Sequence, residues 1–275
     1  MSVGTGDDPR TELAGLAASL RVYLEWHQDA GTVGFPRRSA STSTPTSTPT
    51  STPTSTPTST SSPTPIQVDR HTRLPQLATE VASCVKCGLS ATRTQTVFAR
   101  GNPDAQLCFI GEAPGADEDA QGLPFVGRAG QLLDRMIAAM GLDPETDVYV
   151  CNILKCRPPG NRRPEPEEMA ACFPSLHEQL ALVRPRAIVA LGNTAVGALL
   201  DTKLGITKVR GQWKLYRGQT LVMPTYHPSY LLRPSPQQVE AKRQTWEDLQ
   251  LVMKELGLEL PKSTPKSAPP KSTPK

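Results

Sequence analysis

Four short apolar runs alternate along the chain with helical patterns of apolar residues. The runs lie at residues 106–110, 147–151, 187–191 and 219–223. The helical patterns cover residues 132–140, 165–182, 193–200 and 239–256. Strands and helices that alternate in this way form a parallel sheet covered on both faces, with ligands bound beyond the carboxyl ends of the strands. The sequence therefore predicts an α/β fold built on a four-stranded parallel sheet.

A Ser/Thr/Pro-rich tract at residues 39–67 precedes this predicted domain. It repeats proline about every four residues and has almost nothing apolar to bury, a composition typical of an extended, disordered linker. Residues 8–28 show helical spacing of leucines. We therefore expect four parts, namely an N-terminal amphipathic helix region at 1–38, the linker at 39–67, one folded domain at 68–260 and a disordered Lys/Pro-rich tail at 261–275.

The formal net charge of +4 equals the contribution of four tail lysines, Lys262, Lys266, Lys271 and Lys275. The predicted domain is therefore near neutral, and contact with a polyanion requires a local basic patch. The sequence shows neither a secretory signal nor an apolar run long enough to cross a membrane. We expect a cytoplasmic, nucleoid-associated protein, in which cysteine pairs indicate metal binding or catalysis rather than disulfides.

Four of the six cysteines have a spacing that suits metal ligands. Two are separated by two residues, and the other two flank a loop rich in arginine and proline; they are Cys84, Cys87, Cys156 and Cys172. Four thiolates hold either zinc or a [4Fe–4S] cluster, and the spacing alone leaves both open. Cys108 and Cys151 fall inside predicted strands, where free cysteine commonly acts as a small buried apolar residue.

Several motifs, in order, resemble those of the family 4 uracil-DNA glycosylases, the iron–sulfur type. The motifs are Cys84-x2-Cys87, residues 111–115 with Glu118-Asp119, residues 122–130, residues 152–159, Cys172 and residues 227–233. The resemblance runs from Cys84 into the last helix and leaves the linker and tail outside. It implies a three-layer α/β/α domain, a structural [4Fe–4S] cluster on the four cysteines, and hydrolytic removal of uracil from DNA in base excision repair.

The resemblance also implies a uracil-binding pocket, into which the base must be flipped out of the DNA stack. Phe125 would stack on the base, and Asn152 would pair with its N3 and O4 groups. Cytosine reverses the donor and acceptor on that edge, so the carboxamide would reject it. Glu112 would lie near uracil C5 and help exclude the methyl group of thymine. Gly111 opens the loop whose backbone N–H groups would face the base or a phosphate.

Catalysis requires a donor at uracil O2, where negative charge develops as the N-glycosidic bond breaks. The resemblance implies that His227 is this donor, with Glu112 and Asn152 as the other catalytic residues. In the family 1 enzymes an Asp stands at the position that resembles Ala113 here, so that base is missing. Glu112, Glu118 and Asp119 are nearby in sequence, and the sequence does not assign the water to any of them.

DNA contact requires cations for the phosphates and a wedge for the gap left by the flipped base. The basic candidates are Lys155, Arg157, Arg162, Arg163, Arg210, Arg217 and Arg233. The wedge candidates are Tyr230, Leu231 and Leu232. We expect a monomer that acts on single- or double-stranded DNA and does not bind membranes, with residues 1–38 available to recruit a repair or replication protein.

Two alternatives remain at this point. One is a non-catalytic DNA-binding or scaffold protein with a structural zinc. The other is the related class that links covalently to abasic DNA and resembles this chain except for a reactive histidine in the basic loop. Residues 155–163 contain no histidine, which argues against the second alternative.

Overall fold

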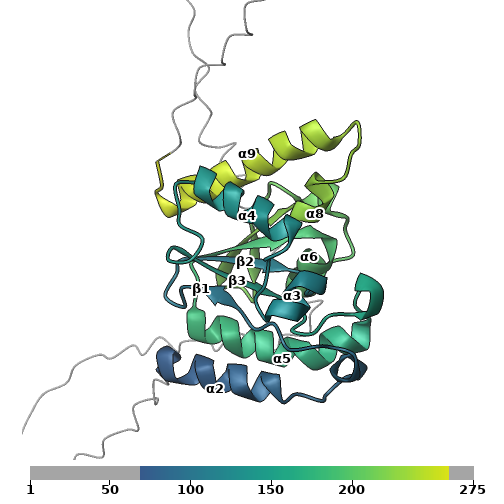
Figure 1. Ribbon diagram of the computed structural model, residues 1–275. Coiled ribbons are helices and arrows are strands. Elements are labelled where there is room, and N and C mark those ends of the chain that lie inside the picture. The colour runs from purple at the N-terminus through teal and green to yellow at the C-terminus, as the bar shows by residue number, and fades with distance from the viewer. Residues whose placement is uncertain (1–68, 260–275) are drawn as a thin grey trace, which may run out of the picture. The chain divides into compact units, whose positions relative to one another are not determined.

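The computed structural model describes residues 69–259, which form an α/β domain (Figure 1). The expected helix at 8–28, the linker and the tail lie outside the described residues. The helices are α2 (Arg70–Ala82), η1 (Gly88–Ala91), α3 (Ala116–Gln121), α4 (Arg128–Ala139), η2 (Pro159–Asn161), α5 (Pro166–Val183), α6 (Gly192–Leu200), α7 (Ile206–Val209), α8 (Pro228–Leu231) and α9 (Gln238–Leu256). The strands are β1 (Arg100–Gly101), β2 (Leu107–Gly111), β3 (Val148–Asn152), β4 (Ala187–Leu191), β5 (Lys214–Tyr216) and β6 (Thr220–Thr225).

The strands form one six-stranded sheet in the order β1-β3-β2-β4-β6-β5. The four central strands are parallel and are the four predicted from the sequence. The outer strands β1 and β5 pair antiparallel with β3 and β6. The expected four-stranded, wholly parallel sheet is therefore wrong in number and in its edges. The edge strands have two and three residues, too few to show a periodic pattern in the sequence.

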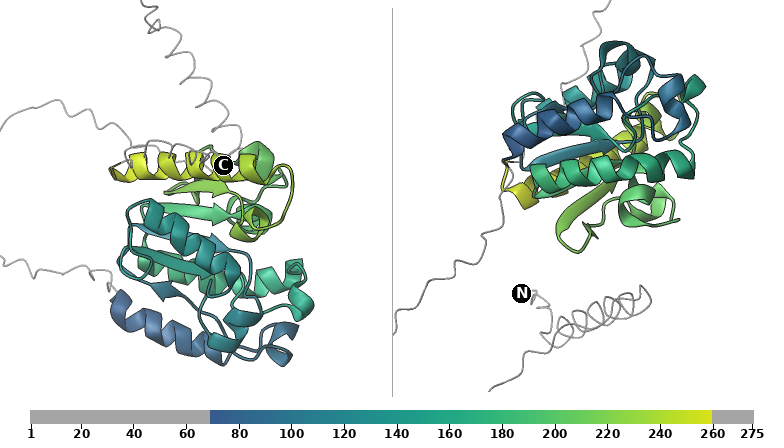
Figure 2. Two further views of the ribbon diagram at one scale, coloured as in Figure 1. Left: turned by 45° about the horizontal axis from the view of Figure 1, so that its top comes forward. Right: turned by 90° about the horizontal axis from the view of Figure 1, so that it is seen from below.

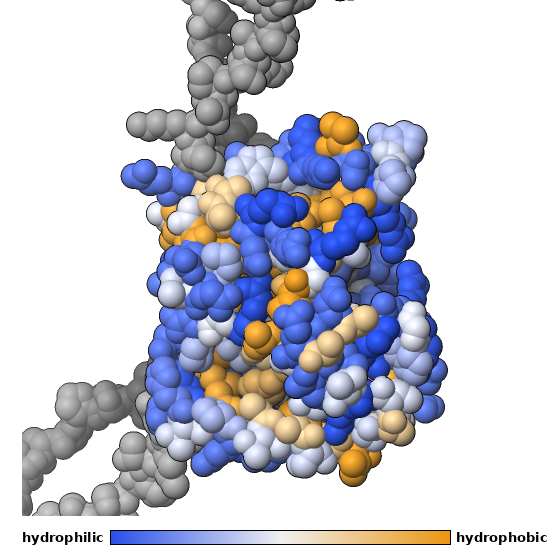
Figure 3. Space-filling model, in the orientation of Figure 1, coloured by the Kyte–Doolittle hydropathy of each residue, from blue (hydrophilic) through white to orange (hydrophobic). Residues whose placement is uncertain are grey.

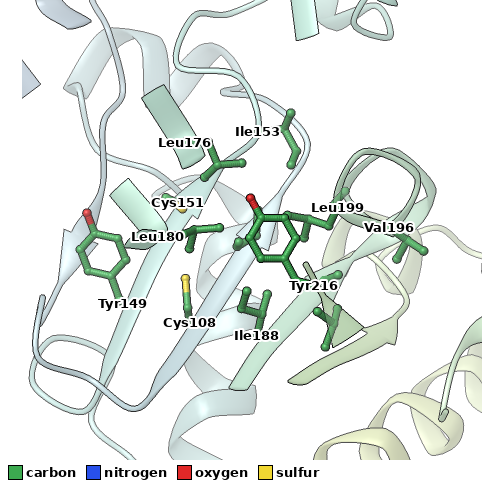
Figure 4. Close-up of a cluster of buried hydrophobic side chains, with 14 of the residues drawn as sticks. Cys108, Tyr149, Cys151, Ile153, Leu176, Leu180, Ile188, Val196, Leu199 and Tyr216 are labelled. Carbon is green, nitrogen blue, oxygen red and sulfur yellow. The ribbon is translucent and has the colours of Figure 1, made fainter. Parts of the chain in front are cut away.

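Helices cover both faces of the sheet, as predicted. On one face, residues such as Cys108, Ile110 and Ile188 form a core with α2, α5, α6 and α7. Figure 4 shows part of this core, where Cys108 and Cys151 extend from the neighbouring strands β2 and β3. On the other face, alternate strand residues such as Phe109 and Val189 pack against α4 and α9. Successive side chains on a strand point to opposite faces, so each fully buried strand supplies both cores.

Helix α5 lies along the sheet, and α2 packs against its outer side (Figures 1 and 2). Pro166 stands in the first turn of α5, and the Glu168 side chain accepts a hydrogen bond from the backbone N–H of Glu165 at 2.8 Å. Both features favour the start of a helix at this point. Arg70 in α2 donates to the carbonyl of Val183 at the end of α5 (3.1 Å), which fixes the two helices together.

The surface of residues 69–259 is mixed in character. In the face drawn in Figure 3, hydrophobic residues form small separate patches among hydrophilic ones. None of the helices in this part of the chain has the length and apolar character that a bilayer crossing requires.

Candidate active site

The parallel strands bring four sequence-predicted positions to one edge of the sheet. Gly111 ends β2 and is in register with Asn152, the last residue of β3. Gly192 follows β4 directly, and His227 lies two residues beyond the end of β6. These are carboxyl ends of parallel strands, which is where α/β sheets place their ligands.

Gly111, Phe125 and Asn152 are in close contact at this edge. A Cβ atom at Gly111 would lie 2.4 Å from Phe125 Cζ and 2.5 Å from Asn152 Oδ1, so only glycine leaves room for both side chains. Asn152 is buried, with 2% of its surface exposed. Its Nδ2 is the one buried side-chain nitrogen or oxygen in residues 69–259 that has no hydrogen-bond partner. A buried donor left unpaired is costly and points to a ligand that pairs with it.

The backbone around Phe125 is held in an unusual conformation. Phe125 has φ 57°, in the left-handed region that side chains other than glycine rarely adopt. Gly130 allows this, because a Cβ there would lie 1.8 Å from the carbonyl oxygen of Phe125. The buried Arg100 donates to the carbonyl of Pro124 (2.9 Å). Strain of this kind persists where the surroundings hold it and gathers at functional sites.

His227 stacks against Phe125, with ring centroids 5.8 Å apart and 29° between the planes. Its Nδ1 accepts a hydrogen bond from the backbone N–H of Ser229 (3.1 Å), so this nitrogen carries no proton. In the neutral ring, the proton therefore sits on Nε2. Burial, with a smaller contribution from the positive charge of Arg233, lowers the pKa of His227 from 6.5 to about 4. The imidazole is therefore neutral at pH 7 and presents Nε2–H as a donor.

The three nearby carboxylates have different surroundings. Glu118 accepts hydrogen bonds from the backbone N–H groups of Gly115, Val126 and Gly127 at 3.0, 3.0 and 2.9 Å. Asp119 is buried, and its two carboxylate oxygens share the N–H of Thr94, at 3.0 and 3.1 Å. Glu112 is partly buried, and its carboxylate makes no hydrogen bond within residues 69–259.

Cys84, Cys87, Cys156 and Cys172 line one pocket, as the spacing predicted they should converge. This pocket leaves about 20 Å³ for the centre of a water-sized sphere. Two sulfurs already accept hydrogen bonds, Cys156 Sγ from Arg93 Nη1 (3.3 Å) and Cys172 Sγ from the backbone N–H of Lys155 (3.4 Å). Cys108 and Cys151 are fully buried in the core, the role expected for them.

The four thiols line one pocket, but within residues 69–259 they do not form a site for a single ion. Zinc requires four sulfurs at about 2.3 Å from one centre, and no group of three or more His, Cys, Asp or Glu side chains in residues 69–259 is arranged to hold one metal ion. In a [4Fe–4S] cluster each thiolate binds its own iron, so the sulfurs surround a volume. Burial raises the pKa of Cys156 and Cys172, and a bound metal would deprotonate such thiols.

The loop from Gly111 to Gly115 lies between the two sites. Gly111 contacts Asn152 and Phe125. Ala113 packs against the small core that contains Leu89, Leu154 and Cys156. The two sites therefore share a wall.

The predicted DNA-contacting residues have different degrees of exposure. Arg163 and Arg233 are exposed and Arg157 is partly exposed, with its Nε bonded to Asn161 Oδ1 (2.8 Å). Tyr230 is 40% exposed and stacks on Tyr226 with centroids 5.2 Å apart. Leu231 is 2% exposed, so this structure does not support its predicted contact with DNA.

Some of the basic candidates are engaged by other side chains of the protein. Arg162 pairs with both oxygens of the buried Glu168, at 2.9 and 2.6 Å. Arg210 pairs with Asp248, and Arg217 contacts the ring of His177. Lys155 is 1% exposed, so the expectation that it binds a phosphate at the surface is wrong. Its ammonium has three buried oxygen acceptors instead.

Two supporting residues were missed in the sequence. Arg93 donates to the carbonyl of Cys84 (2.7 Å) as well as to Cys156 Sγ. Asp248 on α9 is fully buried and accepts from Thr225 Oγ1 (2.6 Å), two residues before His227. The signal for Asp248 was a carboxylate on the apolar face of the last helix, between the core residues Thr245 and Leu249. Arg93 gave no such signal.

Comparison with known proteins agrees with this geometry. A profile of the Uracil DNA glycosylase superfamily matches residues 98–250. A type-4 uracil-DNA glycosylase of Thermotoga maritima is 50% identical over 154 residues, 56% of this chain and 80% of that protein. Those of Sulfurisphaera tokodaii and Saccharolobus solfataricus are 44% and 45% identical over 168 residues, 58% of this chain and 76% and 77% of theirs. The chain therefore belongs to the uracil DNA glycosylase superfamily and groups with its type-4 members.

Proposed function

We propose that this chain removes uracil from DNA by hydrolysing its N-glycosidic bond and leaves an abasic site. The observation that carries the proposal is the buried, unpartnered Nδ2 of Asn152 beside Phe125 and Gly111. A donor in that position needs an acceptor from a ligand, and uracil O4 is such an acceptor. Membership of the superfamily supports the same reaction.

Recognition of uracil follows from the Asn152 carboxamide. Its Nδ2 would donate to uracil O4 while its Oδ1 accepts from N3–H. Cytosine presents an amino group and an unprotonated N3 on the same edge, so both contacts would become repulsive. A site built on such hydrogen bonds rejects the wrong base strongly, because its buried polar groups are left unpaired. Phe125 offers an aromatic face on which the flipped base can stack.

Departure of uracil requires stabilisation of the charge that develops on O2. His227 supports this role because its neutral ring carries the proton on Nε2, and Ser229 holds Nδ1 from the other side. A preorganised donor of this kind lowers the barrier by about 2.7–4 kcal/mol in comparable oxyanion sites. No proton needs to leave the imidazole during the step.

The water that attacks the sugar requires a group to orient it. Glu118 and Asp119 accept hydrogen bonds from backbone N–H groups. Glu112 makes no such bond within residues 69–259 and follows β2 directly, next to Gly111. We therefore assign Glu112 to the water and to the region of uracil C5. The negative phosphates of the substrate would add to the stabilisation of the cationic sugar.

Cys84, Cys87, Cys156 and Cys172 would hold a [4Fe–4S] cluster. Such a group, when bound, would supply structural bonds that join the 84–93 segment, the loop after β3 and helix α5. The existing hydrogen bonds to two of the sulfurs support this assignment, since such bonds are common tuning contacts of clusters. Zinc is the less favoured alternative.

The DNA would lie over the pocket mouth, with Tyr230 as the wedge and Arg157, Arg163 and Arg233 near the phosphates. Tyr230 is exposed and braced by Tyr226, which suits a side chain that must resist bending when it enters the base stack. Each phosphate neutralised adds about one unit to the slope of log affinity against log salt concentration. We propose a monomer for this complex, in the cytoplasm, with residues 1–38 as a site for a repair or replication partner.

The experiment is a cleavage assay with the full, metal-containing protein. A labelled oligonucleotide with one uracil is incubated with the protein and then treated with alkali, which breaks the strand at an abasic site. We expect a break at the uracil position with the native protein and loss of most product with Asn152→Ala. A protein that binds the oligonucleotide but yields no break would instead support the alternative, a metal-containing DNA-binding scaffold.

A further inference from the structure

The ammonium group of Lys155 is fully enclosed. The residue is 1% exposed, and its Nζ donates to the carbonyl oxygen of Phe98 (3.2 Å), the carbonyl oxygen of Asn152 (2.9 Å) and Oε1 of Gln179 (2.6 Å). The ring of Phe98 lies 5.6 Å from the same nitrogen. All three N–H bonds of the ammonium are therefore used, which is the condition for burying such a group.

The three acceptors are all uncharged. Gln179 is itself fixed, because its Nε2 donates to Tyr149 Oη at 2.7 Å and to Phe98 O at 3.3 Å. No ion pair in residues 69–259 contains Lys155. A buried cation is expected to have an anion nearby. The groups near it that can supply negative charge are thiols, namely Cys172 of the four-cysteine set and the core residues Cys151 and Cys108.

The main chain of Lys155 lies against that set. Its backbone N–H donates to Cys172 Sγ (3.4 Å), and the next residue is Cys156. Its carbonyl oxygen accepts from the N–H of Val97 (2.8 Å). One residue therefore contacts a cysteine through its backbone and the peptide of Asn152 through its side chain.

The bond to Asn152 sits where β3 ends. Beyond this point the N–H groups of Ile153 and Leu154 still bond to the carbonyls of Gly111 and Glu112, while the Asn152 carbonyl receives its hydrogen bond from Lys155 Nζ. The peptide that follows the Asn152 Cα is thereby fixed, and with it the direction in which the carboxamide leaves the backbone. A hydrogen-bonding group that reads a base must be held within a fraction of an ångström.

We propose that Lys155 is a positioning residue that holds Asn152 in its uracil-reading orientation and ties that orientation to the four-cysteine site. The inference rests on the proposed function. It assigns to a lysine of the basic loop a role inside the protein, in place of contact with DNA. It also links the four-cysteine site to uracil recognition, since Lys155 contacts both Cys172 and Asn152.

The test is a double-mutant cycle on the full-length protein, with kcat/KM for a uracil-containing single strand as the readout. Lys155→Met removes the charge and the donors but keeps a similar length. We expect it to lower kcat/KM by about 10- to 100-fold, because a misplacement of about 1 Å can cost about 100-fold. In an Asn152→Ala background the same change should lower it by less than about threefold, because the residue it positions is gone.

Two further variants make the cycle decisive. Lys242→Met, at an exposed lysine on α9, is the matched control and should leave kcat/KM unchanged. If Lys155→Met does not fold, Gln179→Met replaces it in the cycle. That variant removes one acceptor of the ammonium and should give a smaller loss that again disappears in the Asn152→Ala background.

The tie to the cysteines has its own readout, the metal retained after dialysis against a chelator. Lys155→Met should lose metal several times faster than Lys242→Met, and equal loss would overturn this half of the proposal. A decrease in kcat/KM of the same size in both Asn152 backgrounds would overturn the positioning role. Failure of the proposed function would show differently, as absence of uracil release by the native protein.

Discussion

The imidazole of His227 stacks on the ring of Phe125, 5.8 Å from centroid to centroid. The two residues come from distant parts of the chain, yet their rings lie together, and Phe125 also lies close to Asn152 at Gly111. Phe125 has a left-handed backbone conformation that its surroundings maintain, and His227 is oriented by the hydrogen bond from the Ser229 N–H to its Nδ1. A ligand between Asn152 and His227 would therefore meet groups whose positions are already set, which is the arrangement that electrostatic catalysis requires.

Replacement of His227 should remove a donor that acts in the transition state. We expect His227→Ala to lower kcat for uracil release by about 100- to 1,000-fold, the usual cost of losing one such donor. Single-turnover assays with excess enzyme measure this directly. The matched control is His71→Ala, because His71 is 59% exposed and pairs with Asp104 on the surface. Equal rates for His227→Ala and the native protein would contradict the assigned role.

The activity should have a pH profile that reflects a neutral His227. The pKa of its ring is lowered by burial from 6.5 to about 4, so the ring stays neutral when the pH is lowered from 8 to 5. We expect kcat to show no step near pH 6.5 that depends on His227, and a decrease only as the pH approaches about 4. A midpoint near 6.5 in single-turnover rates would show that the ring is not buried as described.

The same shift predicts a change in stability with pH. The folded ring binds its proton only below about pH 4, whereas the unfolded ring binds one below 6.5. Between these values the unfolded state holds more protons, so the free energy of unfolding should fall as the pH falls. Urea denaturation across this range measures the slope. His227→Ala should show a smaller slope than the native protein, and an identical slope would exclude His227 as its source.

The backbone of Phe125 depends on the absence of a side chain at Gly130. In Gly130→Ala the new Cβ would lie 1.8 Å from the Phe125 carbonyl oxygen, so the loop must move. We expect a loss of about 2–4 kcal/mol in the free energy of unfolding, in the range of overpacking and strain, together with weaker uracil release. Gly205→Ala is the control, because its nearest neighbour would be 4.0 Å away. Similar unfolding curves for both variants would contradict this account.

Glu118 should matter for structure rather than for chemistry. Its carboxylate accepts three backbone N–H bonds that join the 111–115 loop to the 125–127 loop. In Glu118→Gln an amide NH₂ would face one of these donors, and we expect a loss of about 1–3 kcal/mol in stability. Glu247→Gln tests an exposed pair with Arg243 and should cost less than about 1 kcal/mol. If Glu118→Gln unfolds like the control, the loops are held by other contacts.

The central sheet was predictable from the sequence because each of its four strands is an apolar run flanked by a helix. Because these strands are parallel, their carboxyl ends meet at one edge of the sheet. The sequence alone therefore predicts that Gly111, Asn152 and His227 lie at that edge. The edge strands β1 and β5 were not predictable, because two or three residues carry no pattern. The expected N-terminal helix, the linker and the Lys/Pro-rich tail lie outside the described residues and stay predictions.

The inner surroundings of the site were harder to predict. Lys155 stands in a basic loop, and in sequence it is indistinguishable from its arginine neighbours. Its burial depends on acceptors from Phe98 and Gln179, which are 57 and 24 residues away. Tyr230 and Leu231 are adjacent candidates for a wedge, yet one is 40% and the other 2% exposed. Consecutive residues of the short helix α8 point in different directions, and the packing of that helix decides which of the two faces solvent.

The most direct measurement identifies the base released from a strand that carries one uracil, compared with matched strands that carry cytosine or thymine in its place. We expect free uracil in amounts equal to the abasic sites formed, with no base released from the two comparison strands. Intact uracil-containing strands after incubation with folded, metal-containing protein would contradict it.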